Sequence, residues 1–195
     1  MGNVIHPQYT LKNVLYSAAE RFERGKSIRL HQFLLPEAFA KASRALLAAP
    51  VSESYLPDCY RVHAPKKIPA SVSGLLRWLK STEAAELVSL IVDKRVRCAS
   101  IGIAVLTHGD YTLLHDKNKE PSGFDVILDL TPQWDNRACG YHSYVDGKGN
   151  ELVRVDPAPN TLTIVHRPKN VMKFVKYVNH FAGKDKRIVL QARFA

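Results

Sequence analysis

The chain has little cysteine and no long apolar run. Its three cysteines, Cys59, Cys98 and Cys139, lie far apart, which argues against a disulfide framework and for a reducing, cytoplasmic environment. No run of about 18 apolar residues predicts a membrane span. The first residues lack the basic-then-apolar layout of a secretory signal, and His6 stands where N-myristoylation requires Ser or Thr. We therefore expect no membrane association.

The sequence also lacks the motifs of two large enzyme classes. It contains no G-x-S-x-G turn, so nothing supports the nucleophile of a hydrolase triad. It contains no glycine-rich phosphate loop, because Gly147 and Gly149 belong to a D-G-K-G hairpin turn. The absence of both motifs leaves no support for a triad hydrolase or a P-loop nucleotide-binding protein.

Acidic residues are few relative to basic ones. The 28 Lys and Arg against 18 Asp and Glu give a net charge of +10. Residues 161–195 carry eight basic side chains against Asp185 alone. Such a bias favours an anionic partner, namely nucleic acid, a ribosome or an acidic protein. A solvated basic face without a partner gives the same composition.

The residue pattern changes from helical to strand-like near residue 96. Helical spacing runs through residues 10–49, interrupted by a short strand at 27–34, and returns at 75–80 and 82–92. The Pro- and Ser-rich stretch 51–71 predicts a loop. Eight short β-type runs follow at residues 99–106, 111–115, 124–130, 140–145, 151–155, 161–165, 171–178 and 187–194.

This order predicts an α+β fold. Eight strands after a helical half indicate a jelly roll with the N-terminal helices packed on one of its sheets. We expect a single domain over residues 1–195, with a mostly helical lead-in at 1–95 and a β-rich core at 96–195.

Four motifs in the β-rich half carry a family resemblance. They are GDYTLLHDK (109–117), WDNRACG (134–140), PAPNTLTIV (157–165) and Arg187 in the last strand. Their order and spacing resemble the iron- and 2-oxoglutarate-dependent prolyl hydroxylases, especially the branch that modifies a ribosomal protein. The resemblance implies a double-stranded β-helix, an iron-binding His and Asp in the first motif, a distal His, and Arg187 as ligand of the co-substrate carboxylate.

The chain departs from that family at the iron ligands. The family pattern is His-x-Asp, whereas this chain reads His115-Asp116-Lys117, and a shift of one residue turns a strand side chain to the opposite face. The distal His is expected near Lys173. A charged lysine has no lone pair for a metal. A rearranged site would need Asp116 to turn inward at a bulge and His166 or His180 to supply the second imidazole.

Three hypotheses follow. The first is a pseudoenzyme that uses the oxygenase fold as a binding module, with Arg187, Lys117 and Lys173 holding an anion or a macromolecule and no cofactor expected. The second is an active dioxygenase with Fe(II) and 2-oxoglutarate that hydroxylates a translation-related protein through a rearranged triad. The third is a basic RNA- or ribosome-associated protein. The lysines could also simply reach solvent and bind nothing.

Overall fold

The computed structural model describes residues 4–114 and 121–195. Four α-helices occupy the N-terminal half of this part of the chain. They are α1 (Lys12–Gly25), α2 (Pro36–Ala48), α3 (Ala70–Leu79) and α4 (Thr82–Val92), with one 3-10 helix, η1 (Pro7–Thr10). Pro36 occupies the first turn of α2, and the Ser81 hydroxyl accepts a hydrogen bond from the Ala84 amide at the start of α4. No helix in the described ranges is long and apolar enough to cross a membrane.

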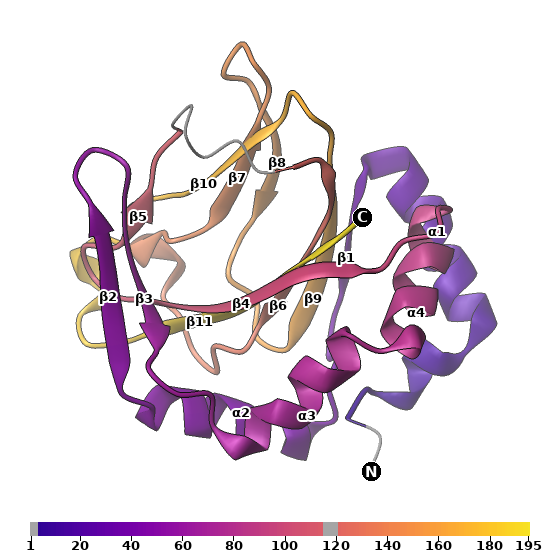
Figure 1. The fold of residues 1–195 in the computed structure, drawn as a ribbon, viewed down its shortest axis with the longest axis horizontal. Coiled ribbons are helices and arrows are strands. Elements are labelled where there is room, and N and C mark those ends of the chain that lie inside the picture. Colours follow the sequence, from indigo (N-terminus) through magenta and orange to yellow (C-terminus); the bar gives the residue numbers. More distant parts are fainter. Residues whose placement is uncertain (1–3, 115–120) are drawn as a thin grey trace.

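The strands form two antiparallel sheets (Figure 1). The larger sheet has the order β1-β9-β6-β11-β4-β3-β2, with β5 on β3, and the smaller has the order β10-β7-β8. The strands are β1 (Ser27–Leu30), β2 (Val51–Leu56), β3 (Tyr60–Pro65), β4 (Cys98–Leu106), β5 (Tyr111–Thr112), β6 (Gly123–Asp129), β7 (His142–Val145), β8 (Glu151–Val155), β9 (Thr161–Arg167), β10 (Met172–Val175) and β11 (Arg187–Phe194). Two 3-10 helices, η3 (Asn136–Ala138) and η4 (His180–Ala182), lie between strands.

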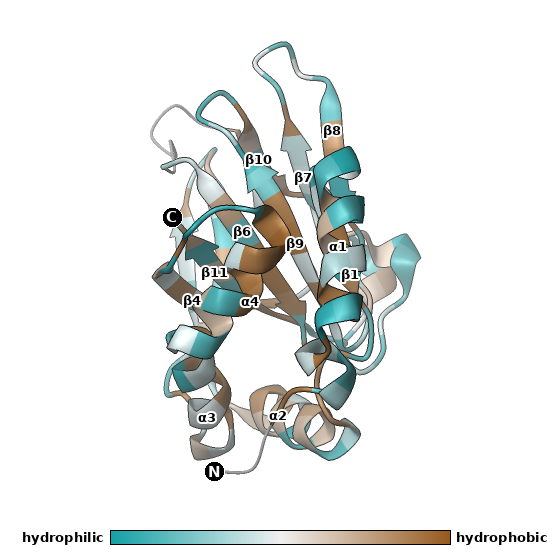
Figure 2. Cartoon of the chain, turned by 90° about the vertical axis from the view of Figure 1, so that its right-hand side faces the viewer, coloured by the Kyte–Doolittle hydropathy of each residue, from teal (hydrophilic) through white to brown (hydrophobic). Residues whose placement is uncertain are grey.

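Each of the eight predicted runs of the C-terminal half contains a strand among its described residues, although the run at 111–115 contains only the two-residue β5. The predicted double-stranded β-helix is confirmed. The helices cover one face of the larger sheet (Figures 1 and 2), as expected for a jelly roll with a helical lead-in. On β6, Phe124, Val126 and Leu128 join the core shared with the helices. Asp125 and Ile127 alternate with them and face the smaller sheet.

The loop predicted for residues 51–71 is wrong over most of its length. Residues 51–65 form a hairpin in which β2 and β3 pair from Val51 with Pro65 to Leu56 with Tyr60. The prolines misled the prediction because they lie beside or at the ends of the strands, where a missing amide does not break the ladder. Asp58 closes the turn with φ 59°. The hairpin joins the larger sheet where His63 pairs with Val105.

The asparagine of the PAPN motif fixes the start of the core strands. The Asn160 amide donates to the Leu34 carbonyl at 2.9 Å and accepts from the Leu34 amide at 2.8 Å. Its own backbone accepts from Phe33 and donates to Asp129. Asn160 has φ 50°, a left-handed conformation that asparagine tolerates better than most residues. One side chain thus ties the segment before α2 to the entry of β9.

We predict that Asn160→Ala lowers the free energy of unfolding by about 3 kcal/mol, because two buried hydrogen bonds disappear and the Leu34 backbone is left unpaired. Urea unfolding measures the loss. Asn150→Ala, in the exposed turn between β7 and β8, is the control and should cost less than about 1 kcal/mol. Equal, small losses for both variants would contradict the structural role of Asn160.

Candidate functional site

The space between the two sheets, here called the barrel interior, holds an unusual number of charged side chains. The residues of β6, β9 and β11 that face away from the helices point into it. Five titratable side chains of these three strands and β7 are buried there, with 5% exposure or less for each residue. They are Asp125, Asp129, His142, Arg167 and Arg187. In the prolyl hydroxylase fold, this is the region expected to hold iron and the co-substrate.

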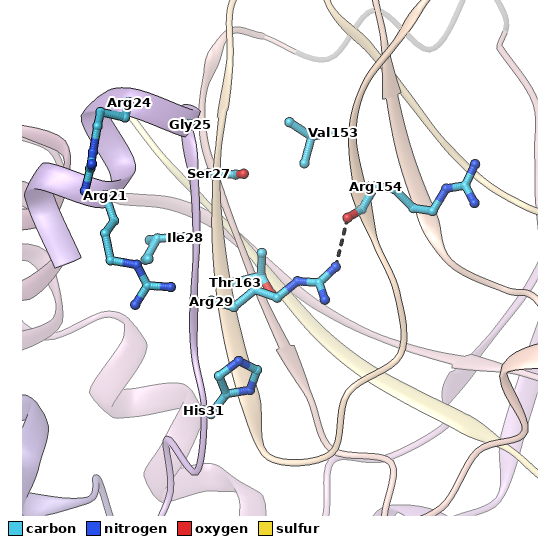
Figure 3. Close-up of a pocket in the computed structure, with 10 residues that line it drawn as sticks. All are labelled: Arg21, Arg24, Gly25, Ser27, Ile28, Arg29, His31, Val153, Arg154 and Thr163. Atoms are coloured by element: carbon cyan, nitrogen blue, oxygen red, sulfur yellow. Dashed lines mark hydrogen bonds between the residues drawn. The ribbon is translucent and has the colours of Figure 1, made fainter.

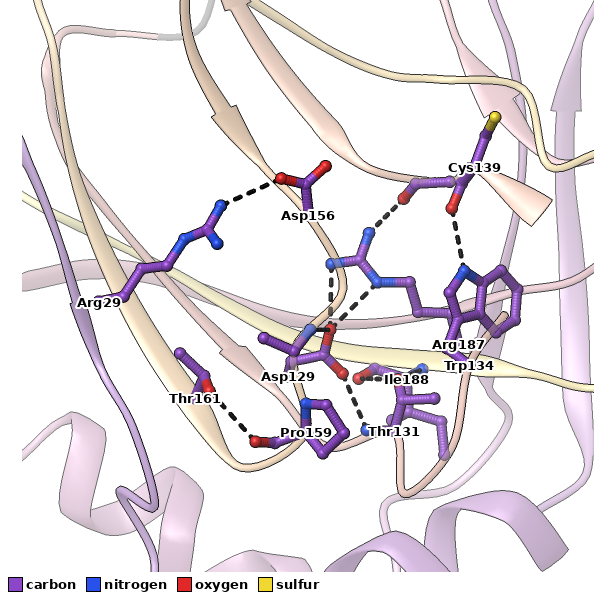
Figure 4. A network of polar contacts seen from close by, with 12 residues as sticks. Arg29, Asp129, Thr131, Trp134, Cys139, Asp156, Pro159, Thr161, Arg187 and Ile188 are labelled. Carbon is purple, nitrogen blue, oxygen red and sulfur yellow. Dashed lines mark hydrogen bonds and ion pairs between the residues drawn. The ribbon is translucent and has the colours of Figure 1, made fainter. Parts of the chain in front are cut away.

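Arg187 is fully buried and bound on both sides (Figure 4). Its Nε and Nη2 donate to Asp129 Oδ2 at 3.2 and 3.1 Å, and its Nη1 donates to the Gly140 carbonyl. The Asp129 carboxylate also accepts from the amides of Thr131, at 2.9 Å, and Ala158, at 3.2 Å. Burial lowers the pKa of Arg187, and Asp129 opposes this shift. We call the contacts of Arg187 with Asp129 and with the Gly140 carbonyl the clasp.

A second buried carboxylate, Asp125, collects three partners. It accepts from Arg167 Nε at 3.0 Å and from the Tyr144 hydroxyl at 3.0 Å, and it pairs with Lys173 Nζ at 3.3 Å. Lys173 also lies 3.4 Å from Gln191 Oε1. Burial raises the pKa of Asp125, but the positive charge of Lys173 and the contacts with Arg167 outweigh it, so the net pKa is lowered. Asp125 is therefore a counter-ion and not a proton donor at neutral pH.

His142, on β7, lies between the two charge clusters. Its side chain is fully buried, and neither ring nitrogen has a hydrogen-bond partner in the described part of the chain. Burial lowers its pKa well below the ordinary value, and the charges of Arg187 and Lys173 lower it further. His142 is consequently a neutral imidazole at physiological pH, held between two cations.

The predicted anion site does not assemble from the two residues that the structure describes. Lys173 pairs with Asp125 and Arg187 pairs with Asp129. These carboxylates lie four residues apart on β6, roughly 13 Å at the rise of a β-strand. Lys173 and Arg187 therefore serve separate carboxylates and do not clamp one small anion. Lys117, the third residue of that prediction, lies outside the described residues.

The two predicted metal ligands that the structure describes, His166 and His180, do not point into the barrel interior. His115 and Asp116 lie outside the described residues. His166 faces the helix side of the larger sheet and stacks on Phe124 at 5.1 Å, so its side chain points away from the barrel interior. His180 is exposed in η4, where it contacts Phe181. Among residues 4–114 and 121–195, no group of three His, Cys, Asp or Glu side chains could hold a metal. The prediction that His166 or His180 supplies a second imidazole to a metal in the barrel interior therefore needs correction, because neither side chain points there.

The described residues therefore do not fit iron or 2-oxoglutarate. A co-substrate carboxylate would need guanidinium donors that face it, but Nε, Nη1 and Nη2 of Arg187 each already donate to Asp129 or to the Gly140 carbonyl. A divalent cation would meet three cations, Arg167, Lys173 and Arg187, against two carboxylates. Cationic surroundings disfavour Fe²⁺ at short range.

Sequence reasoning missed Asp125, Asp129 and His142. Their signal was present, because each occupies an inward position of a strand whose other inward residues are apolar or aromatic, such as Ile127 and Tyr144. A charged residue at a buried strand position requires a partner. The alternation could thus have shown that counter-ions for the basic strand residues lie within the fold.

Comparison with known proteins agrees with this architecture. Residues 60–195 match the family described as "Oxoglutarate and iron-dependent oxygenase degradation C-term". The chain belongs to this family. A curated relative, prolyl 3-hydroxylase OGFOD1 of Mus musculus, is 36% identical over 74 residues, which cover 37% of this chain and 14% of the mouse protein. The match thus spans a small part of that relative's length.

Solved structures agree on the fold. A 2OG-Fe(II) oxygenase family oxidoreductase from Burkholderia pseudomallei superposes with a TM-score of 0.68 at 12% identity, covering 93% of this chain and 90% of that chain. A prolyl hydroxylase from Trichoplax adhaerens, solved with a hypoxia inducible factor peptide, has a TM-score of 0.65 at 12% identity and coverage of 96% and 94%. The fold is that of the prolyl-hydroxylase-like 2-oxoglutarate oxygenases.

We predict that Asp129→Asn lowers the free energy of unfolding by about 3–5 kcal/mol, because it leaves the buried charge of Arg187 without its counter-ion. Chemical denaturation measures the loss. Asp135→Asn is the control, since it breaks the exposed pair with Arg137 and should cost at most about 1 kcal/mol. Similar losses in the two variants would show that the clasp is not a structural element.

His142→Leu should raise stability at pH 7 by about 1 kcal/mol, because an unpaired buried polar group becomes apolar. In the parent protein, stability should fall as pH drops below about 6.5, by up to ~1.4 kcal/mol per pH unit, since the unfolded chain binds a proton that folded His142 resists. His142→Leu should weaken this fall, and the exposed replacement His180→Leu should not. Parallel pH curves for all three proteins would refute the assignment.

Proposed function

We propose that this chain is an oxygenase-fold binding module that does not carry out iron chemistry of its own. The observation that carries the proposal is the clasp, in which Asp129 occupies the guanidinium of Arg187 that the family resemblance assigns to the co-substrate. An enzyme that binds a dicarboxylate at this arginine would need to keep its donors available.

Electrostatics supports the same conclusion. The described charges of the barrel interior are Arg167, Lys173 and Arg187 against Asp125 and Asp129, and His142 is neutral. A site for Fe²⁺ normally presents two imidazoles and a carboxylate on one side of the metal. Here Lys173 occupies the strand expected to supply the distal imidazole, and it is already paired with Asp125.

The alternative is an active dioxygenase that hydroxylates a protein substrate. The name of the mouse relative, a prolyl 3-hydroxylase, favours it, although the match covers 14% of that protein. This alternative requires His115 and Asp116 to recruit a further ligand. His142 is the one histidine of the described chain that points into the barrel interior with both nitrogens unpaired, so it is the residue that such a site would have to use.

The test is direct measurement of iron and co-substrate binding to the full chain. The purified protein is loaded anaerobically with Fe(II), passed through a desalting column and measured for iron, and 2-oxoglutarate binding is followed by calorimetry. An active iron-dependent prolyl hydroxylase, handled in parallel, controls for the loading. We expect much less than one iron per chain and no saturable binding of 2-oxoglutarate.

One iron per chain that is lost in His115→Ala or His142→Leu, together with succinate formation, would overturn the proposal in favour of the dioxygenase. Substoichiometric iron that is unchanged in both variants would identify adventitious metal and leave the binding-module proposal supported.

A further inference from the structure

A second hollow in the molecule lies outside the barrel interior, between α1 and the open edges of the two sheets (Figure 3). This arginine cleft has a volume of about 600 Å³. Its positively charged side chains are Arg21 and Arg24 from the last turns of α1 and Arg29 from β1, and His31 follows directly after this strand. Arg154 contributes its backbone, because its side chain turns toward Glu151 and the ring of Tyr141.

The positive charge of the arginine cleft is only partly compensated. No aspartate or glutamate lines it. Arg29 crosses the cleft, donates to the Arg154 carbonyl at 3.0 Å and pairs with Asp156 at 3.3 Å. Within the described residues, no carboxylate lies within 4 Å of the guanidinium of Arg21 or Arg24, and the side chain of Arg24 donates a hydrogen bond to the Glu20 carbonyl at 3.4 Å. Two exposed guanidinium groups thus remain available to an anion.

Two strand edges border the arginine cleft. β1 pairs with β9 and β8 pairs with β7, and each ends its sheet in the described topology. A strand at the end of a sheet has unpaired amides and carbonyls along its outer side, which can accept another strand. One of these carbonyls, that of Arg154, is already used by Arg29. The remaining edge offers main-chain hydrogen bonds next to free guanidinium groups.

We propose that the arginine cleft binds an acidic peptide segment of a partner protein in an extended conformation. The guanidinium groups of Arg21 and Arg24 would bind its carboxylates, for which a planar two-pronged donor is well suited. The adjacent strand edge would pair with its backbone. A single-stranded nucleic acid fits less well, because base stacking favours a row of exposed aromatic rings, and among the lining residues only His31 has an aromatic ring.

The test measures binding of a fluorescein-labelled octaglutamate peptide to the full chain by anisotropy. Arg21→Ala/Arg24→Ala should weaken binding about tenfold, which corresponds to about 1.4 kcal/mol, because two exposed ion pairs with the peptide are lost. The matched control, Lys66→Ala/Lys67→Ala, removes the same charge from an exposed segment after β3 that does not line the cleft, and it should change affinity less than twofold. Thermal melts check that both variants fold.

A second probe tests the extended conformation. Octaglutamate that is N-methylated at every residue keeps its side-chain charge but loses every backbone amide donor. It should bind severalfold more weakly than the unmodified peptide.

Several outcomes would overturn the proposal. They are no binding, an equal loss in both double variants, equal binding of the methylated and unmodified peptides, or tighter binding of octauridylate that depends on Arg21 and Arg24. The last result would assign the cleft to nucleic acid. None of these results bears on the proposed function, because the test of that function measures the binding of iron and 2-oxoglutarate in the barrel interior.

Discussion

The buried carboxylate of Asp129 is the constraint on which the C-terminal half of the fold depends. It lies at the end of β6 and binds the start of β11 through Arg187 and the segment before β9 through the Ala158 amide. Arg187 extends the connection to Gly140, in the turn before β7. A buried charge pair is stable only when further hydrogen bonds satisfy its own polar atoms, and here the amides of Thr131 and Ala158 and the Gly140 carbonyl supply them. The clasp therefore fixes the relative positions of both sheets.

The clasp gives the family motifs a structural role. WDNRACG ends at Gly140, whose carbonyl binds Arg187, and Trp134 closes the turn by donating to the Cys139 carbonyl at 3.0 Å. A Cβ at Gly140, where φ is +71°, would meet Val178 at 3.0 Å. PAPN supplies the bonds of Asn160 to Leu34. Three of the four motifs thus have structural roles that need no co-substrate, so their presence is weak support for catalysis.

The sequence predicted the arrangement of strands better than it predicted the site. Short alternating runs and turn residues are local signals, and they placed all eight strands of the β-helix. The hairpin of β2 and β3 was missed because its prolines resemble those of a loop, although they lie at strand ends. The arrangement of the barrel interior depends on which basic residue forms an ion pair with which carboxylate. Asp129 and Arg187 are 58 residues apart in the chain, and no local pattern joins them.

Charge along the sequence is also a poor guide to charge at the surface. Residues 161–195 have the strongest basic bias, yet Arg167, Lys173 and Arg187 from this segment point inward and pair with Asp125 or Asp129. The segment's outward charge is smaller than its composition implies. The uncompensated guanidinium groups of the arginine cleft come instead from α1. In the sequence, Glu20 and Glu23 stand beside these arginines, so the net charge of the segment does not indicate a basic site. An anionic partner is therefore better sought at the helix than at the basic C-terminal strands.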